Sequence, residues 1–233
     1  MESSMQKNKH IPHCIGIIMD GNRRYAKTKG LPALEGHRAG YHKLRDVLAW
    51  AKEAGARELI AYAFSTENWN RTTEEVGYLM NLFREMIVRM TAEAKEENMR
   101  LIFLGERARF SEDILRAIEH AEKETKNCTA FIFGIGLSYG GRAEIIDAIH
   151  RIPEEKRTNI TEAEFGALLW TKEMHDPDLI IRTSGEERLS NFLPWQSVYS
   201  ELYFTETLWP AFTKEEFLAI LTQYGERERR MGK

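Results

Sequence analysis

The stretch Ile15-Gly-Ile-Ile-Met-Asp-Gly-Asn-Arg-Arg-Tyr25 decides how the rest of the chain is interpreted. Its apolar first half has the length and β-branching of a fully buried strand, which gives way to a turn at Asp20-Gly21-Asn22. An aspartate at the carboxyl end of a buried strand offers a hard oxygen ligand for Mg²⁺. The glycine lets the backbone approach a ligand, and Arg23 and Arg24 offer forked donors for phosphate oxygens. A strand that ends in a solvated turn explains this stretch, taken alone, equally well.

The composition is that of an ordinary globular chain of 233 residues, with 42% hydrophobic and 30% charged residues. This length suits a single domain over residues 1–233, in which the polar segment 1–9 is expected to be disordered. A net charge of −3 gives no global basic field, so nucleic acid is not an expected partner. Cys14 and Cys128 form no C-x-x-C pair and predict neither a disulfide framework nor a metal cluster. No apolar run approaches the ~18 residues of a membrane span, so we expect a cytoplasmic protein whose membrane contact is peripheral.

Strand-like apolar runs alternate with amphipathic segments along the whole chain. Beyond the first strand, we expect strands at 59–64, 100–104, 129–135, 178–182 and 200–204. We expect helices at 37–55, 76–90, 111–126 and 142–152, and after the Thr-x-x-Glu capping boxes at Thr161 and Thr213; a third box, at Thr72, opens the helix that carries 76–90. Residues 26–36 are typical of a loop or an irregular helix. The alternation predicts a single α/β domain with a mostly parallel six-stranded sheet flanked by helices.

Polar clusters follow three of the predicted strands, at the edge where an open α/β sheet binds its ligands. They are Asp20 with its turn, Ser65–Arg71 and Arg182–Ser190. Several arginines around one metal-binding carboxylate indicate an anion of high charge, and a diphosphate fits better than a carboxylate. We expect His37 and Glu201, the latter a second carboxylate on the last strand, to join this group. The helix at 76–90 is rich in Met, Phe and Leu, which favours core packing; the alternative is one wall of an apolar tunnel for a hydrocarbon tail.

Six motifs occur in order along nearly the whole chain: Met19-Asp-Gly-Asn-Arg-Arg-Tyr-Ala26, Gly36-His37, Tyr62-Ala-Phe-Ser-Thr-Glu-Asn-Trp-Asn-Arg71, Tyr139-Gly-Gly-Arg142, Ile181-Arg-Thr-Ser-Gly-Glu-Glu-Arg-Leu-Ser-Asn-Phe-Leu193 and Glu201-Leu-Tyr-Phe204. Together they resemble the cis-prenyltransferases, the undecaprenyl diphosphate synthase or isoprenyl transferase family. The resemblance implies a parallel sheet with surrounding helices, an apolar tunnel and a homodimer. It also implies Mg²⁺-dependent condensation of isopentenyl diphosphate with an allylic diphosphate (farnesyl, geranyl or geranylgeranyl diphosphate), which makes a new cis double bond.

The same resemblance implies a role for each matching residue. The allylic diphosphate is held by Gly21, Asn22, Arg23, Arg24 and His37, and isopentenyl diphosphate by Arg182, Arg188 and Ser190. Asp20 and Glu201 serve Mg²⁺, while Asn68 positions the reacting groups; the proton acceptor stays open between Asp20 and the diphosphate. Further substrate-binding residues are Tyr25, Ser65, Thr66, Glu67, Trp69, Arg71 and Leu189.

The end of the chain and one inner strand carry two further expectations. Arg230-Met-Gly232 matches an Arg-x-Gly tail of the family that reaches the partner subunit's isopentenyl site, so residues 226–233 are expected at a dimer interface. Phe131 and Phe133 share one face of the strand at 129–135. Core filling is the favoured role for both rings, and a tunnel floor that shortens the product is the alternative.

Three departures from the common bacterial pattern bear on the substrate and not on the reaction type. Arg23-Arg24-Tyr25 stands in place of Gly-Arg-Trp, Ala33 in place of an arginine, and Ser138 in place of an asparagine. We therefore expect one allylic-diphosphate contact to be missing.

Other classes of protein fit the sequence less well. A haloacid-dehalogenase-type phosphatase needs a nucleophilic aspartate where Ile18 stands, a trans-prenyltransferase needs DDxxD motifs, and a P-loop enzyme needs GxxxxGK[ST]. A non-catalytic partner subunit of a two-subunit cis-prenyltransferase would keep the fold and lose the site. The presence of Asp20, Asn68, Arg71, Arg182, Arg188 and Ser190 argues against that alternative.

Overall fold

Six parallel strands form one sheet at the centre of the molecule. A computed structural model describes residues 10–227, and in it the strands are β1 (Cys14–Ile18), β2 (Glu58–Ser65), β3 (Met99–Leu104), β4 (Phe131–Tyr139), β5 (Leu179–Arg182) and β6 (Glu201–Phe204). Their order is β3-β4-β2-β1-β5-β6, and every neighbouring pair is parallel. All five residues of β1 are buried, as expected for an inner strand covered on both faces. The predicted α/β fold with a six-stranded sheet is confirmed.

Seven α-helices lie within the described residues, most of them between strands. They are α1 (Asn22–Thr28), α2 (Ala33–Ala54), α3 (Thr73–Glu96), α4 (Glu112–Thr125), α5 (Gly141–His150), α6 (Glu162–Gly166) and α7 (Lys214–Glu226). Three short 3₁₀ helices accompany them: η1 (Thr66–Asn70), η2 (Glu154–Lys156) and η3 (Trp209–Ala211). The predicted capping boxes place the helix starts correctly, because Thr72, Thr161 and Thr213 each accept the backbone N–H three residues on.

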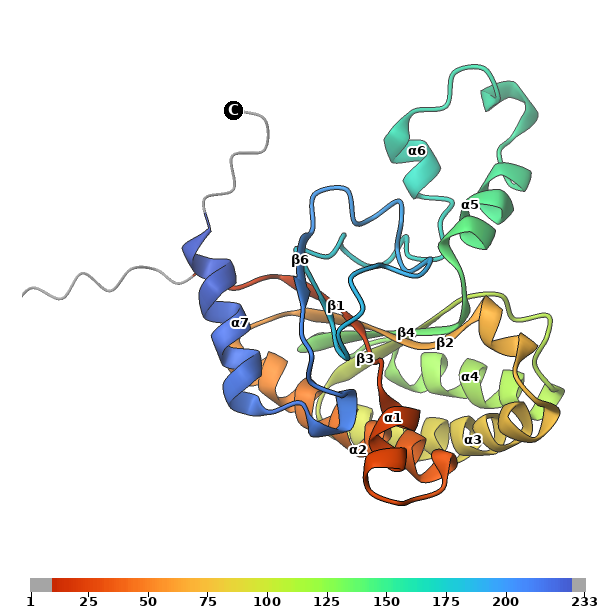
Figure 1. The fold of residues 1–233 in the computed structure, drawn as a ribbon. Coiled ribbons are helices and arrows are strands. Elements are labelled where there is room, and N and C mark those ends of the chain that lie inside the picture. The colour runs from red at the N-terminus through yellow and green to blue at the C-terminus, as the bar shows by residue number, and fades with distance from the viewer. Residues whose placement is uncertain (1–9, 228–233) are drawn as a thin grey trace, which may run out of the picture.

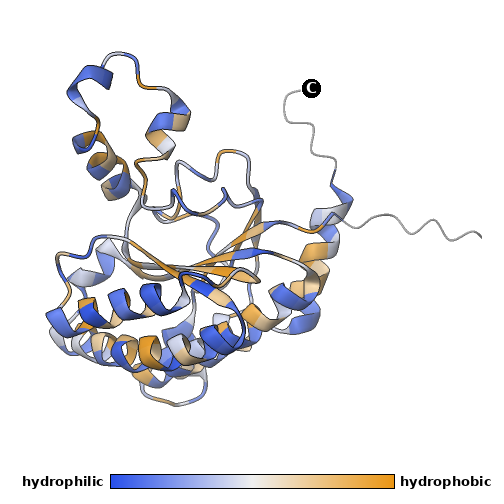
Figure 2. Ribbon diagram, turned by 180° about the vertical axis from the view of Figure 1, so that it is seen from behind, coloured by the Kyte–Doolittle hydropathy of each residue, from blue (hydrophilic) through white to orange (hydrophobic). Residues whose placement is uncertain are grey.

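The two faces of the sheet are covered differently. Helices α1 to α4 pack below it in the view of Figure 1, while α5, α6 and the loop between β5 and β6 lie above. The end of the chain returns to the helical side, because η3 contacts α1 and α2, and α7 contacts α2. Alternate residues of each strand divide between the two sides, so Ile15 and Ile17 belong to the larger core and Cys14 and Ile18 to the smaller one. In Figure 2 the strands are mostly apolar and the outer faces of the helices hydrophilic. Because both faces of the sheet are buried, the register of each strand is fixed. The register in turn determines which residues lie at the carboxyl ends of the strands.

The side chains of Phe131 and Phe133 belong to the larger core, with 1% and 0% of their surface exposed. Both side chains lie on the same face of β4, the face toward α3 and α4, as the alternation along a strand predicts. Both rings therefore serve the core-filling role that the sequence favours.

Residues 26–36 form an interrupted helix, one of the two forms expected for them: α1 ends at Thr28, and α2 begins at Ala33, earlier than the expected start at 37. Helix α1 begins directly after Gly21, whose left-handed backbone (φ 105°) turns the chain out of β1. Strand β4 runs beyond the expected end at residue 135 to Tyr139, because Gly136 still pairs with Tyr62 of β2 and Leu104 of β3. The turn comes at Gly140 instead, where a Cβ atom would stand 2.4 Å from the Thr66 hydroxyl.

Helices α5 and α6 project beyond the sheet as an arm (Figure 1). Large apolar side chains are exposed on this arm and on the loop before β6, namely Ile146, Ile149, Val198 and Tyr199. Within residues 10–227, none of the helices has the length and apolar composition needed to cross a bilayer.

Candidate active site

A cavity of about 550 Å³, here called cavity A, opens at the carboxyl ends of β1, β2 and β5. The three strand-end clusters predicted to meet all contribute to its wall, which includes Asp20, Asn22, His37, Ser65, Glu67, Asn68, Arg71, Arg182 and Ser190. Its apolar part is formed by Ile18, Met19, Ala63 and Leu79, where the sheet faces α3. Cavity A therefore joins charged donors to an apolar wall.

A second cavity of about 570 Å³, cavity B, lies beside the first. The two share Met19, Asp20, Asn22, His37 and Arg71 as common walls. Cavity B adds Gly21, Arg23, Arg24 and Lys27, together with Ala33 at the start of α2. Ala33, at the position where the resemblance implies an arginine, thus lies in the wall of the more basic cavity. Asp20 is on the boundary between two anion-attracting spaces.

The Asp20 carboxylate is fixed by donors and remains one-third exposed. Its Oδ1 accepts the Gly21 N–H at 2.7 Å, and its Oδ2 accepts Nη2 of Arg182 at 2.9 Å. Arg24 Nη2 lies 3.9 Å from Oδ1. A single carboxylate that opens onto two cavities fits Mg²⁺, which binds proteins through one or two carboxylates and takes its other ligands from substrate phosphates and water.

Arg182 ends β5 directly beside the last residue of β1, and only 4% of it is exposed. Its Nη1 donates to Ser190 Oγ at 2.7 Å and also to the backbone carbonyl of Arg188. Its Nε is buried and has no hydrogen-bond partner within the described residues. The guanidinium therefore links Asp20 to the loop after β5 through hydrogen bonds. Its Nε–H remains available to donate a hydrogen bond beside cavity A.

The loop after β5 holds an unusual run of left-handed residues. Ser184, Ser190, Asn191 and Leu193 all have φ between 48° and 83°, a region that side-chain-bearing residues seldom adopt. Asn191 anchors this loop, because its amide donates to Glu67 Oε1 at 2.9 Å and its Oδ1 accepts the Arg142 N–H at 2.9 Å. Backbone strain of this kind gathers at ligand sites.

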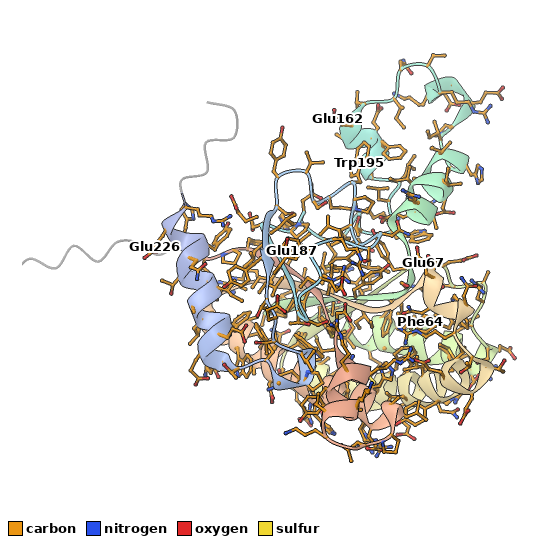
Figure 3. The ribbon with its side chains drawn as sticks, viewed as in Figure 1. Phe64, Glu67, Glu162, Glu187, Trp195 and Glu226 are labelled. Atoms are coloured by element: carbon orange, nitrogen blue, oxygen red, sulfur yellow. The ribbon has the colours of Figure 1, made fainter. Side chains whose placement is uncertain are left out.

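The 3₁₀ helix η1 presents the polar cluster that follows β2. Ser65 and Asn68 form a reciprocal capping box, in which Asn68 Oδ1 accepts the Ser65 N–H at 3.0 Å. The Asn68 oxygen is thus occupied, which leaves its amide donors to face a ligand. Figure 3 shows Glu67 above the end of the sheet and Phe64 below it, toward the helical layer. The cluster is therefore supported by the core directly beneath it.

Glu75, in the first turn of α3, was interpreted from the sequence only as part of a capping box. The structure directs its carboxylate at two guanidinium groups and one imidazole: Arg71 Nη1 at 2.9 Å, Arg23 Nη1 at 3.7 Å and His37 Nε2 at 3.5 Å. Burial and the charge of Arg71 lower the pKa of His37, against an opposing effect of Glu75. Glu75 therefore holds together the basic wall that cavities A and B share.

The Gly36-His37 motif has a packing reason. A Cβ atom at Gly36 would lie 2.0 Å from the Asn22 carbonyl oxygen, and one at Gly40 would lie 2.2 Å from the Asn22 side-chain oxygen. Only glycines on this face of α2 let α1 approach so closely. The close packing carries His37 into the walls of both cavities.

Tyr62 is another wall residue of cavity A that was not singled out as a site residue. Its hydroxyl lies 3.3 Å from the Ser190 carbonyl and 3.2 Å from that of Tyr139. Burial raises the pKa of Tyr62, so the hydroxyl keeps its proton at neutral pH. Its position inside an apolar strand pattern gave no local signal for this role.

Several predicted substrate-binding residues line neither cavity. Trp69 turns to the other side of η1 and donates to Ser138 Oγ at 2.9 Å, so it supports η1 from behind. Thr66 bonds to Glu67 at 3.1 Å, Leu189 packs in the smaller core, and Tyr25 lies under the Lys29 ammonium. Arg188 is an exposed side chain paired with Glu186.

The structure does not place Glu201 in the wall of either cavity, and its role at a Mg²⁺ ion stays a prediction. Glu201 begins β6 and pairs with Leu179 at the start of β5, so it lies at the amino ends of the strands. Asp20 follows the carboxyl end of β1, at the opposite edge. Arg227 is paired with the Glu201 carboxylate. Arg230 and Gly232 lie outside the described residues.

Comparison with known proteins gives consistent matches over almost the whole chain. Residues 18–232 match the model of a family described as putative undecaprenyl diphosphate synthase. The chain is 46% identical over 226 residues to the isoprenyl transferase of Thermotoga maritima, covering 95% of this chain and 97% of that protein. It is also 46% identical over 224 residues to the isoprenyl transferase of Fusobacterium nucleatum, with coverage of 96% and 97%.

Solved structures give the same result. Lavandulyl diphosphate synthase from Lavandula x intermedia, in complex with dimethylallyl diphosphate, superimposes with a TM-score of 0.91 at 32% identity and covers 96% of this chain and 99% of its own. A probable undecaprenyl diphosphate synthase from Campylobacter jejuni gives a TM-score of 0.82 at 32% identity, with coverage of 96% and 100%.

Proposed function

Because the chain belongs to the undecaprenyl diphosphate synthase family, we propose that it is a Mg²⁺-dependent cis-prenyltransferase that condenses isopentenyl diphosphate with an allylic diphosphate. The curated relatives are isoprenyl transferases, so the chain is an enzyme that transfers prenyl groups. The product is a cis-polyprenyl diphosphate, the precursor of a lipid carrier. A cytoplasmic location and a peripheral membrane contact stay predictions from the sequence.

The observation that carries this proposal is the pair of cavities that share Asp20. Cavity B suits the allylic diphosphate, because Gly21, Arg23 and Arg24 surround it beside the amino end of α1. Cavity A suits isopentenyl diphosphate, with Arg182 and Ser190 in its wall. Two diphosphates placed on either side of one carboxylate would bring the two reacting carbon chains together.

In the reaction, the bond between the allylic carbon and its diphosphate oxygen breaks while the isopentenyl double bond forms a new bond to that carbon. A proton then passes from the isopentenyl unit to the released diphosphate or to the Asp20 carboxylate, the two acceptors left open above. Mg²⁺ held by Asp20 would supply positive charge to the departing diphosphate. Arg23, Arg24 and Arg71 add fixed positive charge that binds this diphosphate more strongly as its negative charge grows. The apolar wall at Ala63 and Leu79 would receive the growing hydrocarbon tail.

Asp20→Ala is the test of this assignment. Turnover of labelled isopentenyl diphosphate should fall by roughly two or more orders of magnitude, as it does when a key electrostatic group is removed. Asp46→Ala, which removes an exposed carboxylate paired with Lys43 on α2, is the matched control. Near-normal turnover of a folded Asp20→Ala protein would refute the role of Asp20. An inactive wild type that gains activity only with another subunit would favour the non-catalytic partner instead.

A two-fold homodimer is the second part of the proposal. The exposed apolar side chains of Val198 (70%) and Tyr199 (73%) lie beside a cavity of about 800 Å³ under α6, and they support a second copy of this chain as the occupant of that surface. Val198→Glu should give a monomer in sedimentation velocity; a wild type that is itself monomeric would refute the dimer.

Arg230 and Gly232 are proposed to complete the active site of the partner subunit. Deleting residues 231–233 should therefore reduce activity strongly. Mixing this deletion variant with Asp20→Ala, under conditions where subunits exchange, should restore part of the activity.

A further inference from the structure

Three chemistry-bearing side chains meet at the edge of the sheet opposite cavities A and B. His13 immediately precedes β1, Glu58 begins β2, and His175 lies a few residues before β5. These three segments are brought together because β1 pairs with both β2 and β5. The reaction proposed above uses none of these side chains.

Their ligand atoms already lie close together. His175 Nδ1 is 2.6 Å from Glu58 Oε1, and His13 Nε2 is 3.6 Å from the same oxygen. One ligand atom from each residue can be chosen so that all three lie within 4.8 Å of one another. The two imidazole rings are 4.4 Å apart in an edge-to-face arrangement. The group is compact enough for one ion to reach all three residues.

The backbone around the cluster is held in place by hydrogen bonds. The Asp178 carboxylate accepts the N–H groups of His13 at 2.8 Å and Cys14 at 3.2 Å. The His13 carbonyl accepts the Glu58 N–H at 3.0 Å, and the His175 N–H donates to Glu58 Oε2 at 2.8 Å. The backbones of the three residues are therefore fixed relative to one another, so that only the exposed rings must adjust to hold an ion.

Burial divides the cluster into a fixed carboxylate and two accessible imidazoles. The Glu58 side chain is 3% exposed, whereas those of His13 and His175 are 47% and 70% exposed. A buried carboxylate needs a hydrogen-bonded or cationic partner. His175 Nδ1 makes a hydrogen-bond contact with Glu58 and His13 Nε2 lies 3.6 Å from the same oxygen, while both exposed rings leave an open approach from solvent. An ion could enter at the surface and meet the carboxylate below it.

We propose that His13, Glu58 and His175 form a binding site for a transition-metal ion of the Zn²⁺ type. Two imidazoles and one carboxylate are a ligand set that zinc commonly takes, with water in the fourth position. Bond lengths of about 2.0–2.2 Å in a tetrahedron place ligand atoms about 3.3 Å apart. The exposed rings of His13 and His175 can reach this spacing by side-chain rotation. Mg²⁺ does not compete here, because it prefers an all-oxygen shell.

The consequence of occupancy is stability and not catalysis. An ion at this site connects the segments that lead into β1, β2 and β5, so it stabilises the folded chain in proportion to its affinity. Because the cluster and the cavities lie at opposite edges of the sheet, the effect does not depend on the proposed prenyl transfer.

Zinc titration of the full chain tests the proposal. The protein is prepared without a histidine tag, treated with a chelator and then kept in excess Mg²⁺, and ZnCl₂ is added in a calorimeter. The wild type should bind one equivalent. His13→Gln and His175→Gln, which change exposed side chains, should each weaken binding at least tenfold. The control His120→Gln removes an exposed histidine of α4 and should bind as the wild type does, and so should Asp20→Ala, which separates this site from the catalytic carboxylate.

A second measurement follows the melting temperature with and without Zn²⁺. The wild type and His120→Gln should be stabilised by the ion, and His13→Gln and His175→Gln should not. Wild-type affinity in either cluster variant would overturn the proposal. A wild type that neither binds Zn²⁺ nor melts higher in its presence would overturn it as well, since the cluster would then be only a hydrogen-bonded pair with a neighbouring imidazole.

Discussion

Replacing Arg182 by lysine should destabilise the protein by about 2–3 kcal/mol, although the positive charge is kept. The arginine serves three acceptors through two nitrogens: Nη1 donates to Ser190 Oγ at 2.7 Å and to the Arg188 carbonyl, and Nη2 donates to Asp20 Oδ2 at 2.9 Å. A lysine ammonium is one nitrogen and cannot occupy both positions of the fork. We expect it to lose at least one of the three acceptors.

The size of the destabilisation expected for Arg182→Lys follows from the burial of the Arg182 side chain. A hydrogen bond to a charged group contributes about 1.5–3 kcal/mol. Solvent screens the hydrogen bond to Asp20, because that carboxylate is one-third exposed. We therefore take the contribution of this bond at the lower end of the range. Loss of one buried bond and weakening of a second gives the expected range. For a chain of this size, such a change lowers the melting temperature by roughly 4–12 °C.

Urea unfolding measures the effect, with a lower midpoint and an unchanged dependence on urea concentration. Arg188→Lys is the matched control, since the Arg188 side chain is 62% exposed and paired with Glu186; its stability should stay within about 0.5 kcal/mol of the wild type. If Arg182→Lys is as stable as this control, the fork does not hold Asp20 and the loop after β5 together, and the structural reasoning fails.

Three further predictions concern the basic wall and the two substrates. The pKa of His37 is held below its ordinary value of 6.5 in the folded state, so the unfolded chain takes up this proton first as the pH falls. His37→Gln should therefore lose less stability than the wild type between about pH 7.5 and about pH 5 in urea unfolding; equal losses would contradict the assignment. Glu75→Gln removes the carboxylate that holds Arg71 and Arg23 in the basic wall and should weaken the binding of inorganic pyrophosphate severalfold in calorimetry, while tighter binding would show that the arginines keep their positions without Glu75. Arg188→Ala should raise the KM for isopentenyl diphosphate more than the KM for the allylic substrate, and an equal rise in both would mean that the two sites are divided wrongly.

Residues next to the strand ends were predicted well because their signal is local. The buried run ending at Asp20 specifies both a strand and the edge where it stops, and the same rule places Ser65–Arg71 and Arg182 on that edge. The exact positions of the neighbouring helices were harder. The lysines and glycines of 26–36 fit both a loop and an irregular helix, and packing of α1 against Gly36 and Gly40 makes most of that segment helical.

Other features of the site depend on contacts that are not local in the sequence. Glu75 satisfies a helix-capping pattern completely, so nothing in the sequence shows that its carboxylate turns toward Arg71 and His37. Glu201 was assigned by resemblance, against the strand-end rule, which places the first residue of a strand at the opposite edge. Trp69 belongs to a site motif but faces Ser138, because a 3₁₀ helix divides its residues between two sides.

The position of β1 in the sheet has a consequence for synthesis of the chain. Its neighbour β5 is not complete until residue 182, and the contact between Asp20 and Arg182 spans 162 positions. During synthesis on the ribosome, β1 therefore leaves the ribosome early. Its edge toward β5 stays unpaired until most of the protein has been made. An unpaired apolar edge is a site of aggregation, and contacts so distant in sequence form slowly. Nascent chains that stop before β5 should thus need chaperones far more than the finished protein does.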